Sequence, residues 1–145
     1  MLSCVRRNFA TTRVDRFVVH SIGGEEWFGV NRDGKGMLFT TGPGAASTPV
    51  DFMLLTVGAC SGDDVKYVLE KNDKKVNGLK MEIEGEWAEG TPRRFKEIRV
   101  KYTADSDATK EDVGKVADVV LQKLCPVANT LAGKPCIHVK ASLVK

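Results

Sequence analysis

Two of the four cysteines in this chain stand in contexts where a thiol can do chemistry. Cys60 ends a mostly apolar run that begins at Pro49, and Cys125 directly precedes Pro126 at the close of a second helical stretch. One thiolate can attack an O–O bond and become a sulfenic acid, and a second thiol can condense with it to a disulfide. The alternative is that each cysteine is simply a small, buried hydrophobic residue.

Three segments around these cysteines resemble one protein family. Residues 48–65 resemble the first-cysteine helix of the osmotically inducible (OsmC) and organic hydroperoxide resistance (Ohr) proteins. Residues 92–98 resemble the family's central strand entry, and residues 123–127 resemble its second-cysteine motif. The matches follow the family's order and spacing and together span most of residues 48–130. The resemblance is closest to the general OsmC-like branch.

The resemblance implies a thiol peroxidase that reduces organic hydroperoxides. Cys60 would be the attacking thiol, Cys125 the resolving thiol, and an external dithiol would restore both. An ordinary thiol pKa of about 8.5 leaves little thiolate at neutral pH, so a cation is expected near Cys60. The family's reductases place an arginine in an N-terminal turn that Arg32, followed by Asp33 and Gly34, matches. The alternative for Arg32 is a solvated turn residue.

Asp51 occupies the position of a family glutamate, one methylene shorter. There the carboxylate would orient the arginine and receive the polar end of the peroxide. The alternative is that Asp51 only favours the helix dipole from the first turn. We therefore predict a catalytic set of Cys60, Cys125, Asp51 and Arg32.

The residues near Cys60 give further expectations. Apolar neighbours would line a pocket that prefers organic to hydrogen peroxide: Phe52, Met53, Leu55 and Val57. Gly58 and Gly62 flank Cys60 at helical spacing and indicate a close packing contact or a substrate pocket. Asp63 and Asp64 are expected to be solvated at the start of the helix's amphipathic half.

Composition limits the remaining possibilities. The 145 residues, 42% of them hydrophobic, are enough for one domain with an ordinary core. The net charge of +3 is mild and the basic residues are scattered, which disfavours a nucleic-acid partner. No apolar run approaches the roughly 18 residues of a membrane span. Four cysteines without a CxxC pair and only two histidines disfavour a disulfide scaffold and a metal site. The peroxidase chemistry itself needs no metal, haem or flavin cofactor.

The N-terminal segment has its own composition. Its first thirteen residues carry three arginines, several hydroxyl side chains and no acid. This pattern is typical of a transit peptide. We interpret residues 1–15 as a basic leader-like segment that indicates a mitochondrial location, with a cytoplasmic location as the alternative. Residues 16–145 are interpreted as a single OsmC-like domain.

Local patterns predict an α+β fold. Short strands over 16–20, 27–30 and 37–41 form an antiparallel meander with an Asp-Gly turn. Thr48 and Pro49 start a helix that runs to about Lys75.

The second half of the chain continues the alternation of strands and helices. Strands over 79–87 and near 95–102 form a hairpin. A helix then runs from Thr109 to Leu124, residues 127–132 add a helical turn, and residues 136–141 form a closing strand.

Residues 52–59 are apolar on nearly all sides and are expected to be buried all round. One small sheet cannot cover such a helix. The resemblance implies an intertwined homodimer, with the central helices packed across the two-fold axis and the active sites at the subunit interface.

Two other functions stay open at the level of sequence. An OsmC-fold dimer without peroxidase activity could bind a small apolar or thiol-containing ligand or act as a redox sensor. A purely structural dimer would use both cysteines only as core residues.

Overall fold

The computed structural model describes residues 16–44 and 46–133, which form two compact units. The first unit extends to Ser47, and the second is Thr48–Gly133. The leader-like residues 1–15 and the strand expected at 136–141 lie outside the described residues. Within the described part, no helix is both long and apolar enough to cross a membrane. The assignment of residues 16–145 to a single domain stays a prediction.

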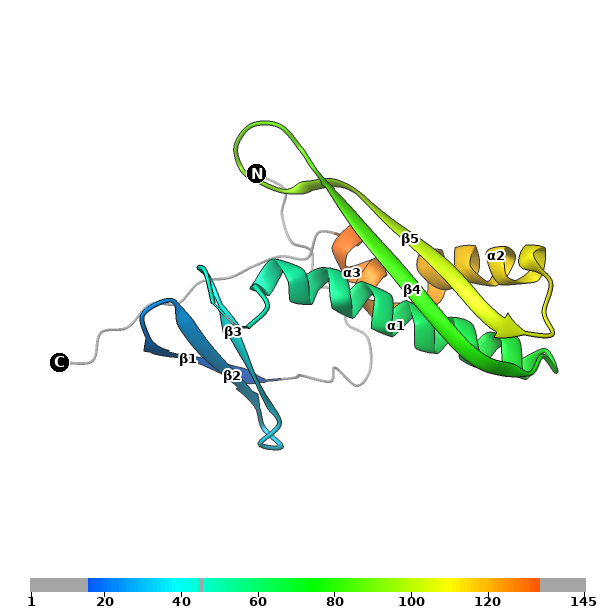
Figure 1. Ribbon diagram of the computed structural model, residues 1–145, viewed down its shortest axis with the longest axis horizontal. Coiled ribbons are helices and arrows are strands. Elements are labelled where there is room, and N and C mark those ends of the chain that lie inside the picture. The colour runs from blue at the N-terminus through cyan, green and yellow to red at the C-terminus, as the bar shows by residue number, and fades with distance from the viewer. Residues whose placement is uncertain (1–15, 45, 134–145) are drawn as a thin grey trace, which may run out of the picture. The chain divides into compact units, whose positions relative to one another are not determined.

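The first unit is a three-stranded antiparallel sheet, ordered β1-β2-β3 (Figure 1). Its strands are β1 (Phe17–Gly23), β2 (Glu26–Asn31) and β3 (Gly36–Thr40). In the turn between β2 and β3, the Asn31 side chain accepts the backbone N–H groups of Asp33 and Lys35. Gly34 has a φ of 77°, which only glycine adopts without strain. The predicted meander is confirmed.

The second unit begins with the long helix α1 (Pro49–Lys71), whose start was predicted correctly. Thr48 and Asp51 form a capping box: Asp51 Oδ2 accepts the Thr48 backbone N–H at 2.8 Å, and Thr48 Oγ1 accepts the Asp51 N–H at 3.2 Å. The predicted end near Lys75 was wrong. Asn72 caps the helix at its last turn, and Asp73 takes a positive φ of 58°, which ends the helix.

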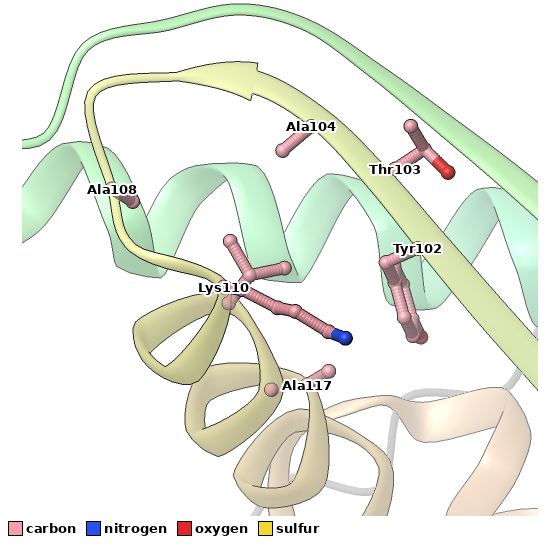
Figure 2. A pocket seen from close by; sticks show the side chains of 8 residues that line it. Tyr102, Thr103, Ala104, Ala108, Lys110 and Ala117 are labelled. Carbon is pink, nitrogen blue, oxygen red and sulfur yellow. The ribbon is translucent and has the colours of Figure 1, made fainter.

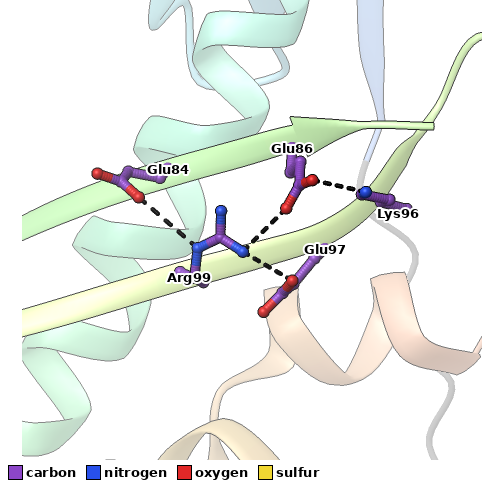
Figure 3. Close-up of polar contacts among 5 residues, drawn as sticks. All are labelled: Glu84, Glu86, Lys96, Glu97 and Arg99. Atoms are coloured by element: carbon purple, nitrogen blue, oxygen red, sulfur yellow. Dashed lines mark hydrogen bonds and ion pairs between the residues drawn. The ribbon is translucent and has the colours of Figure 1, made fainter. Parts of the chain in front are cut away.

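A long hairpin follows α1, formed by β4 (Val76–Trp87) and β5 (Phe95–Ser106). Both strands extend beyond their predicted limits, and Ile83 pairs with Val100 near the middle. The alternation puts apolar side chains on one face and charged side chains on the other. Figure 3 shows part of the charged face, where Arg99 pairs with three glutamates and Lys96 joins the same network: Glu84, Glu86 and Glu97.

The chain ends its described part with α2 (Lys110–Val119), a π-helical turn η1 (Val120–Leu124) and α3 (Pro126–Gly133). A second capping box, between Thr109 and Asp112, starts α2. The helix predicted over 109–124 therefore widens in its last turn. The helical turn expected at 127–132 is confirmed as part of α3.

The elements of this unit meet at α1. β4 packs along the helix, and α2, η1 and α3 also contact it (Figure 1). Gly58 and Gly62 make the contact with β4 close: a Cβ on Gly58 would lie 2.5 Å from Ile83 Cδ1, and one on Gly62 would meet Met81 Cε. The two glycines thus have a packing role within this unit.

The expectation that residues 52–59 are buried on every side was wrong for the chain as described. Val57 and Gly58 are buried against the rest of the unit. Leu55, in contrast, is 53% exposed. The other described elements of this unit cover only part of the circumference of α1 and leave one apolar side of the helix uncovered.

Candidate functional site

Cys60 and Cys125 come together in the second unit. Their Sγ atoms and a carboxylate oxygen of Asp64 all lie within 4.8 Å of one another. Cys60 lies in the middle of α1 and Asp64 one turn later, so both lie on the same face of the helix. Cys125 is fully buried and belongs to the core cluster that includes Val65 and Val120.

The position of Cys125 follows from the irregular end of the preceding helix. The Cys125 N–H donates to the carbonyl of Val120 at 2.8 Å, five residues earlier, which is the bond of a π-helical turn. Pro126 has no N–H and occupies the first position of α3. Cys125 therefore stands at the N-cap position of α3, with its thiol over the start of that helix.

Both sulfurs receive hydrogen bonds from the first turn of α3. The Ala128 N–H donates to Cys125 Sγ at 3.5 Å. The Val127 N–H donates to the Cys60 sulfur, which favours the thiolate and lowers its pKa. The start of a helix carries partial positive charge, so this arrangement stabilises negative charge on sulfur.

The net effect of the surroundings is to raise the pKa of Cys60, despite the hydrogen bond from Val127. Burial raises the pKa of the Cys60 thiol, and hydrogen bonding and charge repulsion from Cys125, together with the negative charge of Asp64, raise it further. Among the described residues of this unit, no lysine or arginine contributes to the pKa of Cys60. A cation close to Cys60 would favour its thiolate.

Asp64 was missed by the sequence prediction, which placed it in solvent. Its Oδ2 atom is buried and has no hydrogen-bond partner among the described residues. The spacing of four residues from Cys60 is the signal that could have placed it at the site. Asp63, one position earlier, is exposed as expected.

A tyrosine links the site to the hairpin. The Tyr102 hydroxyl donates to Ser61 Oγ at 2.8 Å, and Ser61 directly follows Cys60. Ser61 Oγ in turn donates to the carbonyl of Val57 at 2.7 Å, so this buried hydroxyl is satisfied. Burial raises the pKa of Tyr102, and the negative charge of Cys125 adds to the effect. Tyr102 therefore stays protonated and holds β5 against α1 beside the cysteines.

Tyr102 also lines a cavity of about 410 Å³ between β5 and α2 (Figure 2). Lys110 and Ala117 line it as well, and Figure 2 shows the Lys110 side chain extending from the start of α2 toward Tyr102. Neither cysteine lines this cavity, and neither do the four apolar residues of α1 that the sequence suggested for a substrate pocket.

The other two predicted site residues are at the start of α1 and in the first unit. Asp51 is in the first turn of α1, where the Thr48 side chain and backbone bond its carboxylate and lower its pKa. At a rise of about 1.5 Å per residue, Asp51 lies roughly 13–14 Å along the helix from Cys60 of the same chain. Arg32 belongs to the first unit, in the turn after β2, where it forms an exposed ion pair with Asp33. Their catalytic roles stay predictions.

Comparison with known proteins identifies the family of this chain. The model of the OsmC-like protein family matches residues 42–140, which include α1, the hairpin and both cysteines of the site. The chain belongs to the OsmC-like protein family.

Relatives support this assignment at two levels. Protein YhfA of Escherichia coli (strain K12) is 29% identical over 84 residues, which are 57% of this chain and 63% of YhfA. The chain thus spans less than two thirds of that curated relative. An OsmC-like protein from Mycoplasma pneumoniae has a TM-score of 0.73 at 16% identity, covering 85% of this chain and 90% of its own.

The fold is also that of a hydroperoxide resistance protein. The organic hydroperoxide resistance protein OhrB of Bacillus subtilis has a TM-score of 0.59 at 14% identity, covering 83% of this chain and 92% of its own. At these identities the likeness shows the OsmC-like α+β fold and not a shared activity.

Proposed function

We propose that this OsmC-like protein is a thiol peroxidase that reduces organic hydroperoxides through Cys60 and Cys125. The observation that carries the proposal is the approach of the two sulfurs to within 4.8 Å at the start of α3. Structural core cysteines have no need of a second thiol at this distance or of peptide N–H groups directed at both sulfurs. Hydroperoxide-resistance relatives with the same fold support the choice of substrate class.

The reaction balances as a two-electron exchange. The Cys60 thiolate attacks the terminal oxygen of the hydroperoxide, the O–O bond breaks, and the alkoxide takes up a proton and leaves as an alcohol. The Cys125 thiol then condenses with the Cys60 sulfenic acid: the S–S bond forms, the S–O bond breaks, and the hydroxyl leaves with the thiol proton as water. An external dithiol reduces this disulfide by exchange, becomes oxidised itself and returns both thiols.

The geometry allows the second step. A disulfide has an S–S bond of about 2.05 Å, so the sulfurs must approach by less than roughly 3 Å. Cys125 lies between a π-helical turn and a proline-started helix, where the backbone is not fixed by a continuous helical ladder. Rotation of the two side chains and a small backbone adjustment close the distance.

Activation of Cys60 requires the predicted cation. Arg32 is the residue that we propose for this role, oriented by Asp51. Because Asp51 is roughly 13–14 Å from Cys60 along one helix, it would act on Cys60 of a second copy of the chain. The proposal therefore includes a homodimer. The exposed apolar residues Val50 and Leu55, 38% and 53% exposed, support it, since a second helix would cover them.

The test is the consumption of cumene hydroperoxide by the reduced protein with a dithiol. We expect turnover in the wild type, none in Cys60→Ser and strongly reduced turnover in Cys125→Ser. Cys136→Ser serves as the matched control, because the same atom is exchanged at a cysteine outside the proposed pair. Equal turnover in Cys60→Ser and Cys136→Ser would refute the role of Cys60. Faster turnover of hydrogen peroxide than of cumene hydroperoxide would refute the preference for organic hydroperoxides.

A second candidate is a redox sensor or thiol-ligand binder that uses the same pair without rapid turnover. The raised pKa of Cys60 favours it, because a mostly protonated thiol reacts slowly with peroxide. In that case the dithiol assay would show no catalysis, while stoichiometric oxidant would still form the Cys60–Cys125 disulfide.

The leader-like residues 1–15 support mitochondrial import as part of the proposal. Import of the full chain into isolated mitochondria, compared with a chain that starts at Arg16, tests this. If both chains are equally protected from added protease, residues 1–15 do not direct import.

A further inference from the structure

Three metal-binding side chains meet at the cysteine site. Cys60 Sγ, Cys125 Sγ and a carboxylate oxygen of Asp64 lie within 4.8 Å of one another. In a tetrahedral zinc site, with Zn–S bonds of about 2.3 Å and a Zn–O bond of about 2.1 Å, such donor atoms lie roughly 3.6–3.8 Å apart. The observed separations exceed these by at most about 1.2 Å, a difference that rotation of the side chains can close.

The balance of charge at the site favours a cation. All three groups are acids, and when ionised they carry charge of the same sign. Asp64 Oδ2 is buried without a hydrogen-bond partner among the described residues, which is costly for a carboxylate. The three donor atoms lie within 4.8 Å of one another, so their ionised forms would repel. A bound cation would remove this conflict.

The surroundings of the sulfurs also fit metal-bound thiolates. The N–H groups of Val127 and Ala128 donate to Cys60 and Cys125, respectively. Hydrogen bonds of this kind orient thiolate ligands and stabilise their charge. Two thiolates and a carboxylate around a divalent ion leave an excess negative charge, which the start of α3 offsets.

We propose that the reduced protein binds one Zn²⁺ ion per chain through Cys60, Cys125 and Asp64, with water in the fourth position. Two thiolates select a thiophilic ion and exclude Mg²⁺ and Ca²⁺, which require oxygen ligands. The sequence disfavoured a metal site because no two cysteines stand in a CxxC pair; the fold brings together donors from α1 and from the start of α3 instead.

Zinc binding and disulfide formation exclude each other in this arrangement. The disulfide removes both thiolates from the donor set, and the metal holds the thiolate electron pairs that would attack a peroxide or each other. Bound zinc would therefore keep Cys60 and Cys125 reduced and unreactive toward peroxide. Removal of the zinc would make both thiols available for reaction.

The test uses the full chain, fully reduced and freed of metal under anaerobic conditions. Titration with Zn²⁺ against a chromophoric chelator measures stoichiometry and affinity, and Cd²⁺ gives a thiolate charge-transfer absorption in the ultraviolet. We expect one ion per chain and loss of the Cd²⁺ absorption in both Cys60→Ser and Cys125→Ser. Wild-type protein oxidised to the disulfide should bind no zinc, which provides a comparison that needs no substitution.

The substitution Asp64→Asn tests whether the Asp64 carboxylate is the third zinc ligand. The amide has the same shape but a neutral oxygen, and we expect zinc affinity to fall at least about tenfold, the lower end of the effect seen even for groups that only support a metal ligand. Asp63→Asn is the matched control, because it removes the same charge at the exposed neighbouring position. Equal affinities in the two variants, or no zinc bound by the reduced wild type, would overturn the inference.

Failure of this inference is distinguishable from failure of the proposed peroxidase. Hydroperoxide turnover without zinc binding overturns the metal site alone. Zinc binding by a protein that never consumes hydroperoxide overturns the peroxidase alone.

Discussion

The Cys60 and Cys125 sulfurs lie within 4.8 Å of each other, although one residue stands in the middle of α1 and the other before the first residue of α3. The close approach depends on the π-helical turn that precedes Cys125, because its i to i−5 bond ends α2 and lets Pro126 begin a new helix. The chemistry proposed for the pair therefore rests on an irregularity in the helical backbone and not on a local sequence motif.

Asp51→Asn should weaken the folded state at neutral pH, because the Thr48 capping bonds favour the charged carboxylate and lower its pKa. A group whose pKa is lowered by folding stabilises the protein above its unfolded pKa of about 3.9 and loses that effect as the pH falls. The urea midpoint of the wild type should exceed that of Asp51→Asn at pH 7, and the gap should close below about pH 4.

The same variant separates capping from catalysis when it is compared with Asp112→Asn. Asp112 forms an identical capping box with Thr109 at the start of α2, and its pKa is lowered for the same reason. If Asp51 orients the activating arginine, Asp51→Asn should lose peroxidase activity well beyond Asp112→Asn at equal stability. Equal activities would leave Asp51 with a capping role only.

Arg32→Ala should lower kcat/KM for an organic hydroperoxide by roughly 10²-fold, the usual loss when one charge-stabilising donor is removed. The reason is that burial and other neighbouring groups raise the pKa of Cys60, and the proposed arginine would favour the thiolate. Arg94→Ala, an exposed arginine beside β5, is the control for the loss of one positive charge. Similar values of kcat/KM for the two variants would show that Arg32 does not activate Cys60.

Asp64→Asn should accelerate alkylation of Cys60 by iodoacetamide at neutral pH in metal-free buffer. Burial is the main cause of the raised pKa of the Cys60 thiol, and the negative charge of Asp64 adds to it, so removal of that charge lowers the pKa and increases the thiolate fraction. The rate is measured on the Cys60 peptide by mass spectrometry. Asp63→Asn should alkylate at the wild-type rate, and an unchanged rate in Asp64→Asn would show that its charge does not reach the thiol.

Gly58→Ala should destabilise the protein by about 1 kcal/mol. Alanine gains about 1 kcal/mol of helix propensity over glycine, but overpacking costs roughly 1–3 kcal/mol. The added Cβ would lie 2.5 Å from Ile83 Cδ1 and 3.0 Å from its Cγ1, so the stiff β-branched side chain must move. Urea unfolding measures the change.

Ile83→Val provides the check on this explanation. Valine lacks Cδ1, so the double variant should be less destabilised than the sum of the single variants. Gly62→Ala, which meets the flexible end of Met81, should change stability by less than about 0.5 kcal/mol. A larger effect at Gly62 than at Gly58 would contradict the packing argument.

Local signals predicted most elements of the fold. The Thr48–Pro49 helix start, the meander and the hairpin all depend on capping, turn and alternation patterns that neighbouring residues determine. The end of α1 was placed too late because the residues after Lys71 lack a glycine or proline before Gly78. There, Asn72 caps the helix and Asp73 adopts a positive φ, which the sequence does not signal strongly.

The candidate site was predicted in part. Family resemblance selected Cys60 and Cys125, and the structure brings them together. Asp64 was assigned to solvent because its polar character outweighed its spacing from Cys60. Its carboxylate lies within 4.8 Å of Cys125 Sγ, a contact distant in sequence that no local pattern could reveal.

The reactivity of the Cys60–Cys125 pair is measured as the mass of the reduced protein after one equivalent of cumene hydroperoxide, followed by peptide mapping. We expect the loss of two hydrogens and a disulfide between the Cys60 and Cys125 peptides. In Cys125→Ser we expect a sulfenic acid at Cys60 that dimedone traps. An unmodified Cys60 with oxidation at other cysteines would contradict the assignment of this pair as the reactive centre.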